Sequence, residues 1–319
     1  MAETLPESFD DVDPDIRTFL DQVAADYSAL ADPLPTDVIE RRRIAEKVRT
    51  RWTAGGPTMA SSVDITLGPK PSRARLHRPT DARDAPVLLY LHGGGWTLFS
   101  IDTHDRLMRE YAARSGCAVL GIDYSLSPEA QFPTALDECE TALHWVRAHG
   151  QDHGLDPNRM AIGGDSAGAN LALATALRLR DQSQDWIRAI LLNYGAFDTD
   201  VRPSHDRYGG DAYMLNVPEM MDFWTNYLGD IDIVANPLAR PLRADVRDLP
   251  PVFQCIAQCD ILLDENIALT ERLIEAGVDV TAEIYTGATH SFLEAVSISP
   301  LADRALADAS DWLARILAA

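Results

Sequence analysis

The sequence contains few cysteines, few lysines and no long hydrophobic run, and each shortage excludes a class of protein. Four cysteines are few for 319 residues, so the sequence predicts reduced thiols. The longest uninterrupted apolar stretches, such as residues 86–91, are far shorter than the roughly 18 residues that a membrane span requires. The first residues do not combine a basic region with an apolar core, so we expect no secretion signal and a cytoplasmic protein.

Positive charge is scarce as well. The chain has 28 Lys and Arg residues against 49 Asp and Glu residues, which gives a formal net charge of −21, and its lysines are Lys47 and Lys70 alone. Binding to a phosphate backbone requires a basic face, and anionic membrane surfaces would repel this chain. We therefore expect neither nucleic acid nor a membrane as a partner.

The composition otherwise fits a folded protein, with 46% hydrophobic and 24% charged residues. The length allows two small domains or one large α/β domain. From residue 62 onward, short β-rich runs alternate with helix-length segments, and this alternation predicts a mostly parallel sheet covered on both faces. The predicted strands are 62–67, 74–77, 86–92, 118–124, 159–163, 187–194, 251–257 and 278–285. The predicted helices are 13–30, 36–52 with Thr36 as its N-cap, 104–114, 133–149, 167–181, 262–276 and 301–317.

The interval 198–248 does not follow the alternation, because about fifty residues exceed the usual length of a connection between a helix and a strand. Its apolar and aromatic content is too high for a solvated loop. We interpret it as an insertion that forms a helical cap over the sheet, together with the N-terminal helices in residues 1–55. The chain then forms one catalytic domain, residues 1–319, with a cap.

The pentapeptide Gly164-Asp165-Ser166-Ala167-Gly168 follows a predicted strand and precedes a predicted helix. A G-x-S-x-G sequence in a strand-turn-helix setting is typical of a nucleophile elbow, in which the serine hydroxyl stands above the sheet at the positive end of the helix. The alternative is a glycine-rich turn in which Ser166 only caps the helix. The setting favours the nucleophile.

A second glycine-rich turn, His92-Gly93-Gly94-Gly95-Trp96, follows the apolar strand that ends at Leu91. Consecutive glycines form an inert turn in many proteins, yet they also allow backbone N–H groups to point at a developing oxyanion. With a nucleophile elbow, the further donor is expected to be the N–H of the residue after the nucleophile, here Ala167.

A serine nucleophile needs a base, and the sequence has eight histidines. His290 lies just beyond the last predicted strand, where a loop can reach back to the elbow; the alternative is a loop histidine packed against Phe292. The third member is expected to be a carboxylate between Ser166 and His290, at the end of a strand. Asp260 fits that position. Asp264 and Glu265 are rivals, although their place in the first turn of a helix suits interaction with the helix dipole.

Two cysteines near this position, Cys255 and Cys259, raise the question of a metal site. No second Cys or His cluster lies nearby in the sequence, so we interpret them as buried thiols and expect no metal ion.

These motifs together resemble those of the hormone-sensitive-lipase-like group of α/β-hydrolases, and within it the bacterial acetyl esterases. Residues 92–96 resemble the HGGG motif, 164–168 the GDSAG motif, and 121–129 the Y-x-L-x-P-E segment; residues 51–57 and 102–109 are similar to acetyl esterase segments. The resemblance implies an α/β-hydrolase fold with a helical cap and no cofactor. It makes Ser166 the nucleophile, Asp260 the acid and His290 the base, with oxyanion donors from Gly94, Gly95 and Ala167.

Two departures affect the acid and base loops: the usual D-P-L is Asp260-Ile261-Leu262, and the usual H-G-F is His290-Ser291-Phe292. The missing proline keeps Asp264 open as an alternative acid. The resemblance implies hydrolysis of short-chain acyl esters. Trp96 lies beside the glycine-rich turn and suits a small apolar pocket, so Trp96 and Tyr194 are candidate substrate-binding residues; the alternative for Trp96 is ordinary packing between the cap and the sheet. We expect a small-molecule ester as the partner of a monomer or homodimer. An amidase or peptidase with the same triad, and a noncatalytic ligand-binding protein of this fold, are the alternatives.

Overall fold

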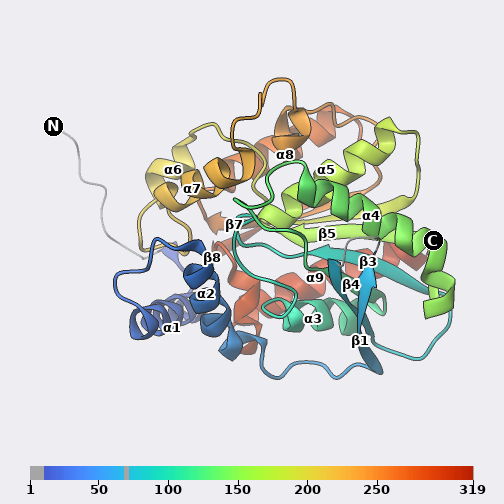
Figure 1. Cartoon of the computed structure of the whole chain (residues 1–319), viewed down its shortest axis with the longest axis horizontal. Coiled ribbons are helices and arrows are strands. Elements are labelled where there is room, and N and C mark those ends of the chain that lie inside the picture. The colour runs from blue at the N-terminus through green and yellow to red at the C-terminus, as the bar shows by residue number, and fades with distance from the viewer. Residues whose placement is uncertain (1–10, 68–71, 319) are drawn as a thin grey trace.

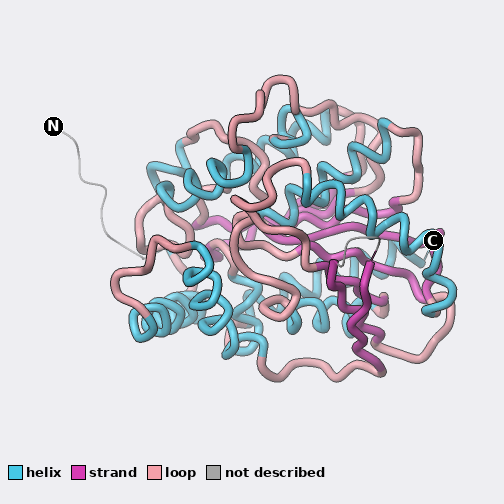
Figure 2. The backbone as a smooth tube through the Cα atoms, viewed as in Figure 1, coloured by secondary structure: helices cyan, strands magenta, loops and turns pink. Residues whose placement is uncertain are grey.

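The computed structural model describes residues 11–67 and 72–318, and within these residues the chain builds one eight-stranded sheet. The sheet crosses the centre of the molecule in the order β1-β2-β4-β3-β5-β6-β7-β8 (Figures 1 and 2). The first two pairings, β1 with β2 and β2 with β4, are antiparallel, and the remaining pairings are parallel. The strands are β1 (Ser61–Leu67), β2 (Ser72–Arg78), β3 (Ala85–Leu91), β4 (Ala118–Ile122), β5 (Leu155–Asp165), β6 (Ile187–Asn193), β7 (Val252–Cys259) and β8 (Val280–Thr289).

Helices cover both faces of this sheet. In Figure 1, α3 and α9 lie below the sheet and α4, α5 and α8 lie above it, while α1, α2, α6 and α7 gather at the end of the molecule where β7 and β8 are labelled. The helices are α1 (Pro14–Leu30), α2 (Val38–Thr53), α3 (Asp105–Ser115), α4 (Thr134–His149), α5 (Ala167–Asp181), α6 (Pro203–Tyr208), α7 (Val217–Leu228), α8 (Leu263–Glu275) and α9 (Pro300–Ala318), with short 3₁₀ turns η2 (Gly150–His153), η3 (Pro237–Ala239), η4 (Pro241–Arg243) and η5 (Phe292–Ser297).

The alternation of strands and helices is the arrangement that the sequence predicts, and the predicted α/β fold is confirmed. The apolar strands β3 and β4 are almost entirely buried, as expected for the centre of a sheet that helices cover on both faces. The four cysteines are buried and free. Among the described residues, no group of three or more Cys, His, Asp or Glu side chains is placed to hold a metal ion, and no helix is long and apolar enough to cross a bilayer.

Several bounds differ from the predictions: strand β8 ends at Thr289, four residues after the predicted end, and two further differences have a direct structural reason. The N-cap of α2 is Asp37 and not Thr36, because the Asp37 carboxylate accepts a hydrogen bond of 2.8 Å from the Glu40 N–H. Strand β5 begins at Leu155, four residues before the predicted start, because Leu155 pairs with Ala85 of β3. The polar and proline residues 156–158 hide this extension from a reading of hydrophobic pattern alone.

The insertion predicted at 198–248 contributes α6 and α7. Helix α7 begins with the N-cap Asn216, whose side chain accepts a hydrogen bond from the Glu219 N–H. Its buried aromatic side chains pack against the turn that follows β3: the ring of Trp96 stacks on Tyr227 at a centroid distance of 4.2 Å and contacts Trp224. These contacts bury the aromatic residues of the insertion and hold α7 beside the glycine-rich turn.

Candidate active site

Ser166 lies in a sharp turn between β5 and α5. Its backbone has φ 55° and ψ −119°, a left-handed conformation that is rare for a residue with a side chain. Its N–H donates a hydrogen bond of 2.9 Å to the carbonyl of Asn193 at the end of β6, which holds the turn against the neighbouring strand. The serine occupies the N-cap position of α5, but its side chain forms no capping hydrogen bond. Its hydroxyl is therefore available to another partner.

The pentapeptide lies so close to β3 that its two glycines, Gly164 and Gly168, leave no space for a side chain. A Cβ at Gly168 would lie 1.9 Å from the carbonyl oxygen of Leu91, and one at Gly164 would lie 2.3 Å from the same atom. Both distances are shorter than any van der Waals contact, so a larger residue would push the elbow away from the strand. This packing sets Ser166 directly beside the start of the 92–96 turn.

Three side chains, each directly after a strand, form a row of hydrogen bonds that ends at the Ser166 hydroxyl. Ser166 Oγ lies 2.9 Å from Nε2 of His290, and Nδ1 of the same imidazole lies 2.7 Å from Oδ2 of Asp260. Asp260 directly follows β7 and His290 directly follows β8, so the parallel sheet brings both to the edge where β5 ends. All three side chains are buried. The other Asp260 oxygen accepts a hydrogen bond of 3.0 Å from the Leu262 N–H, which orients the carboxylate.

The rival carboxylates bind elsewhere. Asp264 accepts a hydrogen bond of 2.8 Å from the N–H of Ser204, at the start of α6. Glu265 is buried and accepts one of 2.6 Å from the N–H of Phe197. Both side chains anchor the insertion to α8, and Asp260 is the carboxylate that hydrogen-bonds to His290.

The electrostatic environment keeps His290 basic. Burial opposes protonation of the imidazole, but the charge and the hydrogen bond of Asp260 outweigh burial, and the pKa of His290 is raised above 6.5. A buried base with a raised pKa accepts a proton from a neighbouring hydroxyl more readily than a free imidazole does.

The glycine-rich turn lies next to the hydroxyl. Gly94 and Gly95 have φ of +100° and +58° and line the same cavity as Ser166 and His290. A Cβ at Gly95 would lie 2.1 Å from the ring of Phe223, so α7 packs directly on the turn. Ala167 is the first residue of α5, and its N–H therefore has no carbonyl within the helix to bond with. Backbone N–H groups in these positions are suited to stabilise negative charge on an oxygen near Ser166.

The side chain of His92, in the same turn, packs against a neighbouring ring and hydrogen-bonds within the turn. Its ring stacks on Tyr124 at a centroid distance of 4.2 Å, and its Nδ1–H donates a hydrogen bond of 2.7 Å to the Gly93 carbonyl. Burial, together with the neighbouring charge of His104, lowers the pKa of His92 to about 3, so the ring is neutral at physiological pH.

A buried ion pair below the elbow is the feature that sequence reasoning missed. Nε2 of His104 lies 3.3 Å from Oδ2 of Asp165, and the hydroxyl of Tyr90 donates a hydrogen bond of 2.9 Å to the other oxygen. Thr103 Oγ1, which donates its own proton to the carbonyl of Ser100, lies 2.9 Å from Nδ1 of His104 and so accepts a hydrogen bond there. Burial opposes protonation of His104, but the charge and the hydrogen bond of Asp165 outweigh it and raise the pKa of this imidazole. The residue preceding Ser166 is thus held by charge.

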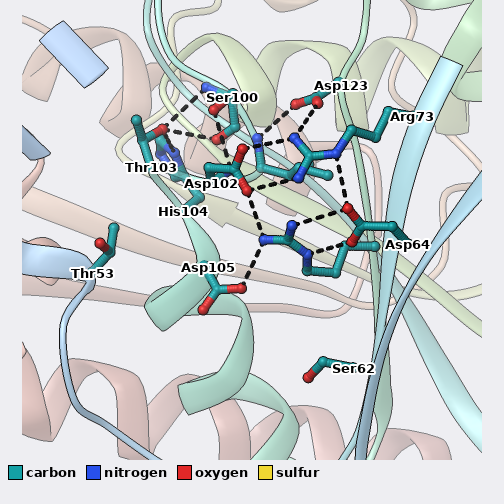
Figure 3. A network of polar contacts seen from close by, with 12 residues as sticks. Thr53, Ser62, Asp64, Arg73, Ser100, Asp102, Thr103, His104, Asp105 and Asp123 are labelled. Carbon is teal, nitrogen blue, oxygen red and sulfur yellow. Dashed lines mark hydrogen bonds and ion pairs between the residues drawn. The ribbon is translucent and has the colours of Figure 1, made fainter. Parts of the chain in front are cut away.

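A network of charged side chains at the surface holds the segment that contains His104 (Figure 3). Arg73 of β2 binds Asp64 of β1 at 3.0 Å and Asp102 at 2.7 Å. Asp102 immediately precedes Thr103 and His104, so the network ties the antiparallel end of the sheet to the segment that supplies the histidine. Exposed ion pairs of this kind each contribute little to stability, and their main effect here is on the position of the segment.

A cavity of about 620 Å³ opens above Ser166 and His290. Its wall is formed by the glycine-rich turn and by residues of α1, α2 and α7. The two candidate substrate-binding residues are not part of this wall. Trp96 is fully buried between the turn and α7, where it stacks on Tyr227, and Tyr194 packs edge-on against the His290 ring at a centroid distance of 5.2 Å. Both side chains therefore support the site from behind, and the wall is supplied mainly by the N-terminal helices, with further residues from the segment 211–215 and from α7.

The fold of this chain is similar to that of known proteins over most of its length. A family model described as the alpha/beta hydrolase fold matches residues 88–294, which include Ser166, Asp260 and His290. The structure of a hyperthermophilic esterase from the archaeon Pyrobaculum calidifontis is 32% identical in sequence, with a TM-score of 0.89, and the match covers 97% of this chain and 99% of that chain.

Two further structures agree with this comparison. A thermophilic and thermostable carboxylesterase cloned from a metagenomic library is 30% identical, with a TM-score of 0.86 and coverage of 88% of this chain and 98% of that chain. An esterase from the bacterial hormone-sensitive lipase family is 28% identical, with a TM-score of 0.85 and coverage of 99% and 100%.

Proposed function

Because this chain belongs to the hormone-sensitive-lipase-like group of α/β-hydrolases and is a carboxylic ester hydrolase, we propose that it hydrolyses short-chain acyl esters through an acyl-enzyme on Ser166. The observation that carries the proposal is the continuous hydrogen-bonded arrangement of Asp260, His290 and Ser166 at the floor of a cavity. Within the group, residues 51–57 and 102–109 are similar to segments of bacterial acetyl esterases, and this similarity supports short acyl chains.

In the first half of the reaction, Ser166 Oγ attacks the ester carbonyl while His290 Nε2 takes the hydroxyl proton. Asp260 holds the imidazole through Nδ1 and stabilises its charged form. The carbonyl oxygen becomes an oxyanion, which the N–H groups of Gly94, Gly95 and Ala167 stabilise. The C–O bond then breaks, and the alcohol leaves with the proton that His290 carries.

In the second half, water attacks the acyl-enzyme. His290 takes a proton from the water, a second tetrahedral oxyanion forms in the same place, and its collapse returns the proton to Ser166 Oγ. The acid is released and the free enzyme is restored.

The proposal of short acyl chains is supported by the contact between α7 and the glycine-rich turn. The ring of Phe223 lies directly over Gly95 and so occupies space beside the position of the reacting carbonyl. The cavity is also within the usual range for small-molecule sites, which is about 300 to 1,000 Å³.

We expect kcat/KM for p-nitrophenyl esters to be highest for acetate to butyrate and to fall by about tenfold or more toward palmitate. The Phe223→Ala variant is expected to extend the accepted range to longer chains, because it removes the ring beside Gly95. Met221→Ala is the matched control, since Met221 lies on the same helix but is 63% exposed. The measurement is initial hydrolysis rates for each ester and variant. Equal or rising kcat/KM along the wild-type series would contradict the short-chain proposal.

The activity is expected to rise with pH through a midpoint above 6.5. His290 acts as a base only when neutral, and its raised pKa keeps it protonated to a higher pH than a free imidazole. Activity is therefore lost as the pH falls through that pKa. A profile of kcat/KM against pH for p-nitrophenyl acetate reports this value for the free enzyme. A midpoint well below 6.5 would show that Asp260 does not raise the pKa of the base.

A further inference from the structure

One acidic side chain in the cavity wall has neither a hydrogen-bond partner nor a salt-bridge partner among the residues that the structure describes. Glu219 lies in the first turn of α7 and lines the cavity with Ser166 and His290. Its N–H bonds to the N-cap Asn216, but its carboxylate makes no hydrogen bond or ion pair with residues 11–67 or 72–318. Burial raises the pKa of Glu219, and the nearby positive charges of Arg41, His290 and Arg49 offset this only in part.

The two arginines of the wall are already neutralised by carboxylates outside it. Arg41 binds Asp222 at 3.0 Å, and Arg49 is buried and binds Glu294 at 2.6 Å. The guanidinium of Arg49 also lies over the ring of Phe99, at 4.7 Å from its centroid. The other acidic residues of the wall are exposed, so salt and water screen them: Asp21, Asp32 and Asp211. The cavity therefore contains one partly buried carboxylate in excess.

Helix α7 places this carboxylate and the ring of Phe223 in the same wall of the cavity. Glu219 and Phe223 are four residues apart on the same face of α7, which separates them by about 6 Å along the helix axis. Phe223 contacts Gly95 of the turn next to Ser166. Glu219 therefore lies about one helical turn from the ring that contacts the glycine-rich turn, in the same cavity as Ser166 and near enough to His290 for the two charges to interact.

Aromatic rings accompany the carboxylate. Phe223 lines the cavity from α7 and Tyr27 from α1, and Tyr27 lies near enough to Glu219 for the charge of the carboxylate to contribute to its raised pKa, after the larger effect of burial. Aromatic faces with a carboxylate are the chemistry that binds alkylated ammonium groups, because the ring quadrupole attracts a cation that water solvates weakly.

We propose that this cavity selects esters that carry an alkylammonium group in the part of the substrate that does not react, with Glu219 as the counter-charge. The inference rests on the proposed esterase function and specifies its substrate class. Glu219 is a specificity-determining residue that binds the non-reacting part of the substrate and takes no part in proton transfer.

The test compares cationic esters with neutral esters of the same shape. One pair, acetylcholine and 3,3-dimethylbutyl acetate, places the charge in the alcohol half. A second pair, the p-nitrophenyl esters of 4-(trimethylammonio)butanoate and 5,5-dimethylhexanoate, places it in the acyl half. Each pair is measured with wild type, Glu219→Gln and Glu271→Gln. The last variant is the control, because Glu271 is an exposed residue of α8 outside the cavity and its substitution changes the net charge equally.

We expect wild type to prefer the cationic member of at least one pair by about five- to tenfold in kcat/KM, mainly through KM. Glu219→Gln should abolish that preference, because it lowers kcat/KM for the cationic ester more than for the neutral ester of the same pair at each pH, while Glu271→Gln should behave as wild type. Absence of a cationic preference in both pairs, or a preference that survives Glu219→Gln, overturns the inference. Hydrolysis of the neutral esters tests the proposed function separately: if they and p-nitrophenyl acetate are all inert, the esterase mechanism itself fails.

Discussion

The Ser166→Ala variant is expected to lose about 10⁴- to 10⁶-fold in kcat for p-nitrophenyl acetate while it keeps the wild-type fold. The Oγ atom that forms the acyl bond is removed, and no other hydroxyl lies within hydrogen-bond distance of His290 Nε2 among the described residues. Alanine adopts the left-handed backbone of this position about as well as serine does. The melting temperature should therefore change little, because the lost side chain supports only the hydrogen bond to His290.

The control for this substitution is Ser183→Ala. Ser183 also has a positive φ, 60°, but it is exposed in the turn after α5 and far along the helix from the nucleophile. It should retain full activity. Comparable esterase rates for Ser166→Ala and wild type, with both proteins folded by circular dichroism, would remove Ser166 from the reaction.

The Asp260→Asn variant is expected to lose about 10⁴-fold in kcat/KM, because an amide at 2.7 Å from Nδ1 favours the wrong tautomer of His290 and no longer stabilises the imidazolium. The pH midpoint of the residual activity should fall, since the charge of Asp260 is what raises the pKa of His290 against burial.

Asp264→Asn provides the comparison for the acid. Asp264 accepts a hydrogen bond from Ser204 and takes no part in the contacts of His290, so this variant should lose less than about tenfold in activity. Steady-state kinetics of the two variants side by side separate the two assignments. A variant pair in which Asp264→Asn is the inactive one would move the acid to Asp264.

The sequence predicts the fold and the three central residues because both follow from order along the chain. Alternating strands and helices specify a parallel sheet, and in such a sheet the residues after the strands meet at one edge. Ser166, Asp260 and His290 each directly follow a strand, so the topology alone places them together. Their hydrogen bonds then need only local loop geometry.

The wall of the cavity could not be predicted in the same way. Glu219 and Trp96 lie in segments whose partners are distant in the sequence, and helical periodicity shows which residues share a face but not what that face meets. Trp96 was expected to contact substrate, yet Tyr227 and Trp224 of the insertion cover its ring. The buried pair of His104 and Asp165 was missed for the same reason, because sixty-one residues separate the two side chains.

The central claim, that Ser166 is the nucleophile of an ester hydrolase, is tested most directly by covalent labelling. Wild type treated with a fluorophosphonate should gain the mass of one phosphonyl group per chain, peptide mapping should place the adduct on Ser166, and p-nitrophenyl acetate hydrolysis should fall in proportion to labelling. Ser166→Ala should remain unlabelled. Full activity after complete labelling, or an adduct on any residue other than Ser166, would contradict the mechanism.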